Sequence, residues 1–254
     1  MPTAPVRELD VYYETHGAGP PLLVISGTGN DLRYSAPHRM PVNEHFAATH
    51  YDQRGLGRTG RPPGPYSMAD YADDAAALID HLGTATTAVL GISFGGMVAQ
   101  HVALRHPARV ERLVLACTSA GGGGGSSADL LALAELPDAE RARRSLALLD
   151  TRNDVDAGRL APGLDVLIEQ GIERQASVST DADASRGARL QLEARAGHDV
   201  WDRLPEITAP TLVIGGHHDG IAPPDNQVAL SSRIPGATLV WADGGHAFLL
   251  QDPA

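Results

Sequence analysis

A serine flanked by glycines, in the sequence GISFG at residues 91–95, constrains the fold of this chain more than any other feature. The apolar and β-branched residues 86–90 before it predict a strand, and the periodicity of residues 96–104 after it predicts a helix. The chain must turn sharply at Ser93 to pass from this strand into this helix. Such a turn needs glycine two residues before and after Ser93, because a Cβ there would collide with the neighbouring strand or helix. The pattern predicts an exposed serine nucleophile, with an ordinary glycine-lined turn as the competing interpretation.

A candidate acid and then a candidate base follow Ser93 along the chain. Residues 209–215 predict a buried strand, and Asp219 lies in the loop after it. Residues 237–241 predict a further strand, and His246 lies in the loop after that one. This order of serine, acid and histidine differs from the orders in chymotrypsin and subtilisin. Asp219 and His246 are therefore the predicted acid and base, and a turn carboxylate and a solvated loop histidine are the alternatives.

The same chain order is that of the α/β-hydrolases, and the chain resembles the branch that contains 3-oxoadipate enol-lactonases and small carboxylesterases. Residues 22–29 (LLVISGTG) resemble the oxyanion strand and loop of that family, and residues 51–57 (YDQRGLG) resemble the end of its next strand. Ser26 departs from the family pattern, because many members carry histidine before this glycine. Such folds usually continue into a last helix beyond residues 251–254, where this sequence stops.

The resemblance implies an α/β fold with a mostly parallel central sheet, helices on both faces of the sheet and an inserted helical cap. Alternating strand and helix patterns in the first half of the chain favour the same architecture. We expect residues 1–119 to form the first part of the core, residues 120–202 the cap, and residues 203–254 the second part of the core.

Two helices of the core have predictable ends. Ser67 and Asp70 have the spacing of a capping box, an apolar stripe follows at helical spacing, and Gly83 should end that helix. The helix after the nucleophile should end at His106, because the residue before Pro107 is disfavoured in the α conformation.

The α/β-hydrolase mechanism then assigns a role to each predicted site residue. Ser93 Oγ would attack a carbonyl carbon as His246 takes its proton, and Asp219 would hold the imidazole. The main-chain N–H groups of Thr28 and Phe94 would bind the oxyanion. We predict cleavage of a small carboxylic ester or lactone, while thioester cleavage, C–C bond hydrolysis and acyl transfer share the same acyl-enzyme chemistry. A ligand receptor with slow turnover is an alternative of another class.

Residues 120–202 contain the features from which the cap is predicted. Five glycines at residues 121–125 predict a flexible hinge without regular structure. No Phe, Tyr or Trp occurs between residues 120 and 200, so a pocket there would be aliphatic and would suit short or compact acyl groups. Helical stretches are expected near residues 128–136, 138–150, 162–175 and 185–197. Charged residues that could bind a substrate carboxylate, or only face solvent, are Arg174, Arg186, Arg189 and Arg195.

Composition limits the other partners. A net charge of −11 argues against a nucleic-acid or anionic-membrane surface, and we expect a cytoplasmic protein because neither a leader nor an 18-residue apolar run is evident. We expect no cofactor, and no metal, because the adjacent His217 and His218 would rarely point together. Cys117, the single cysteine, is expected to be a core residue. A homodimer is left open.

Overall fold

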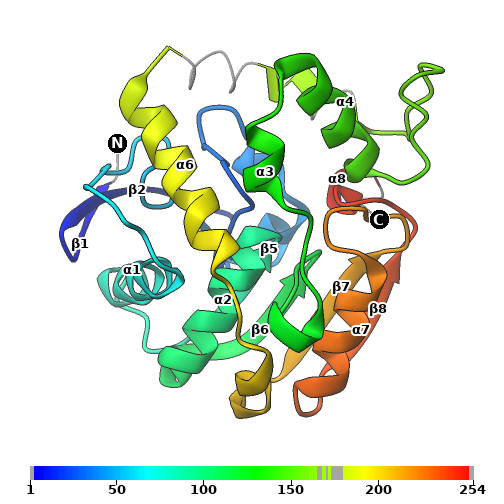
Figure 1. Cartoon of the computed structure of the whole chain (residues 1–254). Helices are drawn as coiled ribbons and strands as arrows, with labels where there is room; N and C mark the ends of the chain where they lie inside the picture. Colours follow the sequence, from blue (N-terminus) through cyan, green and yellow to red (C-terminus); the bar gives the residue numbers. More distant parts are fainter. Residues whose placement is uncertain (1–2, 165–167, 170, 173–179, 252–254) are drawn as a thin grey trace.

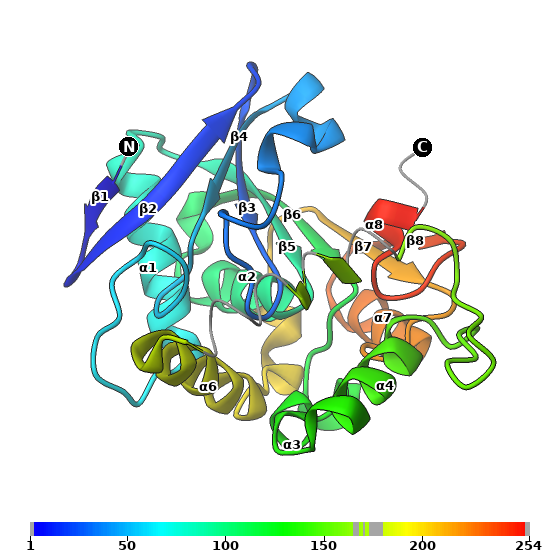
Figure 2. The same ribbon diagram turned by 90° about the horizontal axis from the view of Figure 1, so that it is seen from above.

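The computed structural model describes residues 3–164, 168–169, 171–172 and 180–251. Its centre is an eight-stranded sheet in the order β1-β2-β4-β3-β5-β6-β7-β8 (Figures 1 and 2). β2 pairs antiparallel with β1 and β4, and all other neighbours are parallel, which confirms the mostly parallel sheet. The strands are β1 (Thr3–Val6), β2 (Leu9–His16), β3 (Pro21–Ile25), β4 (Ala47–Tyr51), β5 (Thr87–Ile92), β6 (Val110–Ala116), β7 (Thr211–Gly216) and β8 (Thr238–Ala242).

Helices cover both faces of this sheet. α1 (Met68–His81), α2 (Phe94–Arg105) and α7 (Pro224–Arg233) pack on the face that carries Leu23 and Val89. The opposite face, with Leu22 and Leu90, is covered by α8 (Phe248–Gln251) and by the segment of the 3-10 helices η1 (Pro37–Arg39) and η2 (Pro41–Glu44). Because the central parallel strands are apolar on both faces, each face needs such a cover. No helix in the described part of the chain is long and apolar enough to cross a membrane.

The predicted ends of the two core helices are confirmed. α1 begins with the capping box, in which the Ser67 side chain accepts a hydrogen bond from the Asp70 N–H and the Asp70 side chain accepts one from the Ser67 N–H. Gly83 follows the end of α1 with a φ of +73°, a conformation that favours glycine. α2 ends at Arg105, and His106 is its C-cap. The 3-10 helix η3 (Pro107–Arg109) leads into β6.

Between β6 and β7 the described chain forms helices over the carboxyl ends of the strands (Figure 1). These are α3 (Leu130–Ala134), α4 (Asp138–Leu149) and α6 (Ala182–Ala196), followed by the 3-10 helix η5 (Trp201–Glu206). They confirm the helices expected near residues 128–136, 138–150 and 185–197. Half of the expected helix at 162–175 lies outside the described residues. The division into core and cap at residues 120–202 stays a prediction.

The prediction that the five-glycine run holds no regular structure is wrong. Gly122–Gly124 form a 3-10 helix, η4, which packs against the indole ring of Trp201. A Cβ on Gly123 would lie 2.6 Å from Trp201 Nε1, and one on Gly124 would lie 2.5 Å from Trp201 Cε3. Glycine therefore serves here for close approach of the main chain to an aromatic ring rather than as a loose hinge. Local composition could not show this, because Trp201 lies far along the sequence.

Candidate active site

The turn between β5 and α2 places Ser93 at the carboxyl edge of the sheet. The predicted exposure of this serine is wrong: Ser93 is only 8% exposed, because His246 and the loop at Gly27 lie against it. Ser93 has φ 56° and ψ −116°, a strained conformation for a residue other than glycine. A Cβ on Gly91 would collide with the carbonyl oxygen of Gly95, and a Cβ on Gly95 would collide with that of Ile25. Both glycines of the predicted turn are therefore required for the reason expected from the sequence.

The structure brings the three predicted side chains together. Ser93 Oγ lies 2.8 Å from His246 Nε2, and His246 Nδ1 lies 2.8 Å from Asp219 Oδ2. Asp219 is 2% exposed, and its Oδ1 accepts hydrogen bonds from the N–H groups of Ile221 and Ala222, both at 2.8 Å. Because the Asp219 carboxylate can only accept, it selects the imidazole tautomer with a proton on Nδ1. His246 Nε2 is then free to accept the proton of the serine hydroxyl.

The predicted oxyanion donors lie on either side of this serine. Phe94 is the first residue of α2, and Thr28 follows the end of β3. A Cβ on Gly27 would lie 4.0 Å from Ser93 Oγ, so the loop that carries Thr28 passes directly beside the nucleophile. Within the described chain, neither the Thr28 nor the Phe94 N–H has a hydrogen-bond acceptor. Both groups are therefore available to an anionic oxygen.

The residues after β4 contact the end of β3, where Ser26 departs from the family pattern. Gln53 Nε2 donates to the carbonyl oxygen of Ser26 at 2.8 Å. Asp52 accepts hydrogen bonds from the N–H groups of Leu32 at 2.7 Å and Arg58 at 2.9 Å. Burial raises the pKa of the Asp52 carboxyl to about 6. These contacts tie two loops to the end of β4.

Helix α4 contacts the loops of both the predicted acid and the predicted base. The Gly220 N–H donates to the carbonyl oxygen of Leu148 at 3.0 Å, and the His246 N–H donates to that of Leu149 at 2.6 Å. The Thr151 N–H returns a hydrogen bond to the carbonyl oxygen of His218 at 2.9 Å. The last carbonyls of a helix have no partner within the helix, so these loops satisfy them. Nothing in the sequence pattern indicated this contact.

Possible metal ligands overlap the same site. In the described part of the chain, one group of three could hold a metal ion, and it consists of Cys117, Asp219 and His246, whose ligand atoms lie within 4.8 Å of one another. Cys117 is buried as expected, and burial raises its thiol pKa well above the ordinary value. Its place beside Asp219 was missed, although β6 and β7 are neighbours and both end at this edge.

The adjacent histidines of the acid loop do not point together. His217 stacks on Trp241 and His218 pairs with Asp243, so the two histidines take different partners.

Three of the four arginines considered for substrate binding have other partners in the described part of the chain. Arg186 pairs with Asp183, and Arg189 pairs with Glu135 and Glu193, on the exposed surface of α6 and the end of α3. Arg195 donates to the Ala128 carbonyl oxygen and the Ser127 hydroxyl, and burial lowers its pKa to about 10. Arg174 lies outside the described residues.

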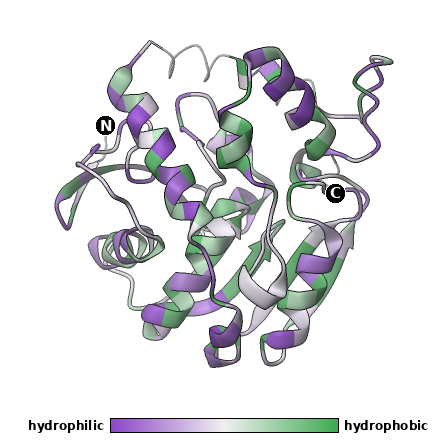
Figure 3. Cartoon of the chain, viewed as in Figure 1, coloured by the Kyte–Doolittle hydropathy of each residue, from purple (hydrophilic) through white to green (hydrophobic). Residues whose placement is uncertain are grey.

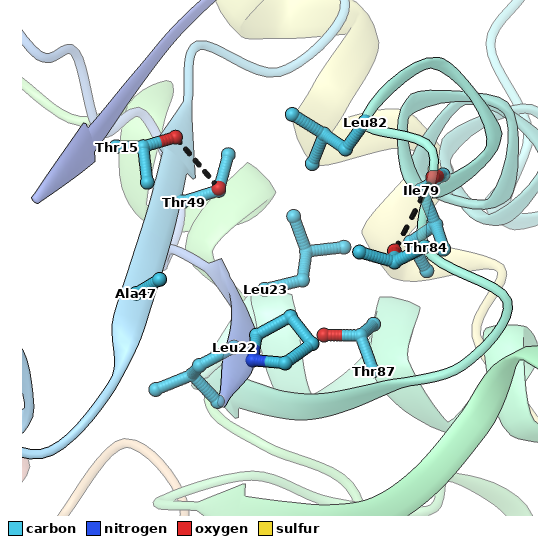
Figure 4. A pocket seen from close by; sticks show the side chains of 10 residues that line it. Thr15, Leu22, Leu23, Ala47, Thr49, Ile79, Leu82, Thr84 and Thr87 are labelled. Carbon is cyan, nitrogen blue, oxygen red and sulfur yellow. Dashed lines mark hydrogen bonds between the residues drawn. The ribbon is translucent and has the colours of Figure 1, made fainter. Parts of the chain in front are cut away.

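A cavity of about 180 Å³ lies at the opposite edge of the sheet (Figure 4). Its lining includes Pro21 and Thr87 at the amino ends of β3 and β5, together with Thr15 and Thr49, whose hydroxyls are 2.9 Å apart. Ligands of parallel α/β sheets bind at the carboxyl ends of the strands, where Ser93 lies. This cavity is therefore separate from the candidate active site.

Comparisons with known proteins identify the family of this chain. The family described as the alpha/beta hydrolase fold matches residues 20–253. The chain is 29% identical to "Putative carbamate hydrolase RutD" of Azorhizobium caulinodans, over 100% of this chain and 94% of that protein. It is 28% identical to 3-oxoadipate enol-lactonase 2 of Acinetobacter baylyi, over 99% and 91% of the two chains.

A solved structure shows the same likeness in three dimensions. The enol-lactonase from Burkholderia xenovorans LB400 superposes with a TM-score of 0.79 and 26% identity, covering 99% of this chain and 95% of that one. The resemblance to enol-lactonases predicted from the sequence motifs is thus confirmed. The chain belongs to the α/β-hydrolase family.

Proposed function

We propose that this protein is a serine hydrolase that cleaves small carboxylic esters or lactones through an acyl-enzyme intermediate. The observation that carries the proposal is the pair of 2.8 Å contacts that join Ser93 to His246 and His246 to Asp219. One imidazole can then exchange a proton with the serine while the carboxylate holds its tautomer. Membership of a hydrolase family supports the same class of reaction.

In this mechanism His246 Nε2 takes the proton of Ser93 as Oγ attacks the carbonyl carbon. The N–H groups of Thr28 and Phe94 stabilise the negative charge that develops on the carbonyl oxygen. When the C–O bond breaks, His246 returns the proton to the leaving oxygen and an acyl-serine remains. Water then attacks the acyl-serine by the same proton relay and releases the carboxylic acid. In a lactone, the leaving hydroxyl stays attached to the acyl group.

Three observations bear on the substrate. The relatives named above include an enol-lactonase, which supports a lactone or a related ester. A carbamate is the second candidate, because the relative at 29% identity is named as a carbamate hydrolase. A carbamate has nitrogen on the attacked carbonyl carbon, so the same serine, base and oxyanion donors would serve. Compact substrates are favoured, because the chain has no aromatic residue between residues 120 and 200.

The proposal is tested with purified protein, Ser93→Ala and the matched control Ser231→Ala, whose hydroxyl is on the exposed surface of α7. p-Nitrophenyl esters, simple lactones and an alkyl carbamate are the substrates. We expect ester or lactone turnover in wild type and Ser231→Ala, and a loss of about 10⁴-fold or more in kcat in Ser93→Ala. A fluorophosphonate probe should label wild type but not Ser93→Ala. Equal labelling of all three proteins, or carbamate turnover without ester turnover, would contradict the proposal.

A further inference from the structure

A glutamine of the cap contacts the loop that carries Thr28. Gln191 lies on α6, and its Oε1 accepts a hydrogen bond of 2.7 Å from the main-chain N–H of Gly29. The side chain is fully buried, with 0% exposure. α6 packs closely against the loop at Gly55. A Cβ on Gly187, one helical turn before Gln191, would collide with the carbonyl oxygen of Gly55. Gln191 therefore reaches the loop from a fixed position.

This contact holds one peptide group of the loop. The Asn30 N–H donates to the Gly27 carbonyl oxygen at 3.3 Å, so residues 27–30 form a turn with Thr28 and Gly29 at its centre. Gly29 has a φ of +65°. The central peptide of such a turn can flip between two turn types, and a flip would swing the Gly29 N–H away from its acceptor. Gln191 therefore favours one orientation of the turn that presents the Thr28 N–H.

The other half of the Gln191 amide is unused. Within the described part of the chain, Nε2 is buried and has no hydrogen-bond partner, and the same is true of the Thr28 hydroxyl. Buried amide donors in folded proteins are nearly always paired, so a buried unpaired one calls for an acceptor. Nε2 shares its carbon atom with Oε1, which places this donor beside the turn at Gly29. Gly27, at the start of the turn, faces Ser93.

We propose that Gln191 has two roles, as a positioning residue for the Thr28 turn and as a specificity residue for the substrate. Its Nε2, together with the Thr28 hydroxyl, recognises a second oxygen on the acyl part, close to the carbonyl that Ser93 attacks. The preferred class is then an alkoxy-, hydroxy- or oxo-substituted acyl ester or lactone rather than a plain alkanoyl ester. This inference rests on the proposed serine-hydrolase function.

The test compares p-nitrophenyl methoxyacetate with p-nitrophenyl butanoate. The two acyl groups have equal length and differ by one ether oxygen in place of a methylene. The measured quantity is the ratio of kcat/KM for methoxyacetate to kcat/KM for butanoate. The intrinsic reactivities of the esters are the same for every enzyme variant, so they cancel when ratios are compared. Folding of each variant is checked by its melting temperature.

Two substitutions separate the two roles of Gln191. Gln191→Glu keeps an acceptor for the Gly29 N–H and removes the donor, so the ratio should fall about 5- to 10-fold, the effect of one hydrogen bond. Gln191→Leu removes both groups, so kcat should fall for both esters in addition to the fall in the ratio. Gln100→Leu is the matched control. Gln100 is also fully buried, but its amide donates to the carbonyl oxygens of Gly96, on α2, and Ser119, after β6. Its ratio should equal that of wild type.

The outcomes distinguish this inference from the proposed function. If wild type cleaves the esters and the ratio is unchanged in Gln191→Glu and Gln191→Leu, the specificity role is wrong while the hydrolase function stands. An equal fall of the ratio in Gln100→Leu would also overturn the specificity role. If wild type cleaves neither ester, nor any other substrate of the screen, the hydrolase function fails and this inference fails with it.

Discussion

The main-chain N–H of His246 donates a hydrogen bond of 2.6 Å to the carbonyl oxygen of Leu149, the last residue of α4. The loop of the predicted base is therefore attached to α4. The neighbouring carbonyl of Leu148 binds the loop of the predicted acid through Gly220. Since a shift of one ångström in such a relay can lower a rate about a hundredfold, the end of α4 is expected to control the alignment of the site.

Gly245→Ala tests this attachment. A Cβ on Gly245 would collide with the Leu149 carbonyl oxygen and would lie 2.7 Å from the Asp150 Cβ. We expect the substitution to separate the base loop from α4 and to lower kcat at least about tenfold. Gly197→Ala is the control, because its nearest contact would be an ordinary 3.6 Å. Equal esterase rates in wild type and Gly245→Ala would show that α4 does not align the base.

Asp219→Asn tests the predicted acid. The amide oxygen can still accept the N–H groups of Ile221 and Ala222, so the melting temperature should change little. The amide also permits the wrong imidazole tautomer of His246, and kcat should fall about 10⁴-fold. Asp243→Asn, a matched change at a residue whose side chain is 77% exposed, should stay close to the wild-type rate. A loss of less than tenfold in Asp219→Asn would place the acid elsewhere.

The stability of the protein should fall in mild acid, in part through His198. Its Nε2 donates to the Ser119 carbonyl oxygen at 3.0 Å, its Nδ1 lies 3.2 Å from His101 Nε2, and burial lowers its pKa from 6.5 to about 4. Between these pH values the unfolded chain binds a proton that the folded protein does not bind, so the free energy of unfolding decreases as the pH falls. One such group contributes about 1.4 kcal/mol per pH unit.

Urea unfolding of wild type and His198→Asn at several pH values between about 7 and 4 measures this effect. The variant should be less stable at neutral pH, because it loses the two contacts of the imidazole. Its stability should also depend less steeply on pH than that of wild type. Parallel curves for the two proteins would exclude His198 as a source of the acid sensitivity.

The length of the acyl chain tests the substrate class. No residue of α4 is buried. Figure 3 shows hydrophilic stretches along α4 and α6. A surface of this kind does not provide the continuous apolar patch that an aggregated lipid would need. We expect acetyl to hexanoyl esters to be cleaved faster than palmitoyl esters, with no rise in activity above the solubility limit of the substrate. A clear preference for palmitoyl esters would show that the cap has been misinterpreted.

The sequence determined the elements that carry the site, because their signals are local. The turn around Ser93 depends on glycines two residues away, and the capping box of α1 depends on two residues three positions apart. Asp219 and His246 were predictable because each follows a parallel strand, and parallel strands in one sheet end at the same edge. The order of these strands in the chain therefore predicts a shared site before any contact is known.

Only the tertiary structure decided which distant segments hold that site in shape. The contacts of Gln191 with Gly29 and of Leu149 with His246 join residues about a hundred positions or more apart. A glycine run has the same composition whether it is loose or packed, and only the place of Trp201 shows that this run is packed. Such contacts depend on how helices lie over the sheet, and that arrangement depends on side-chain packing across the whole chain rather than on any local spacing.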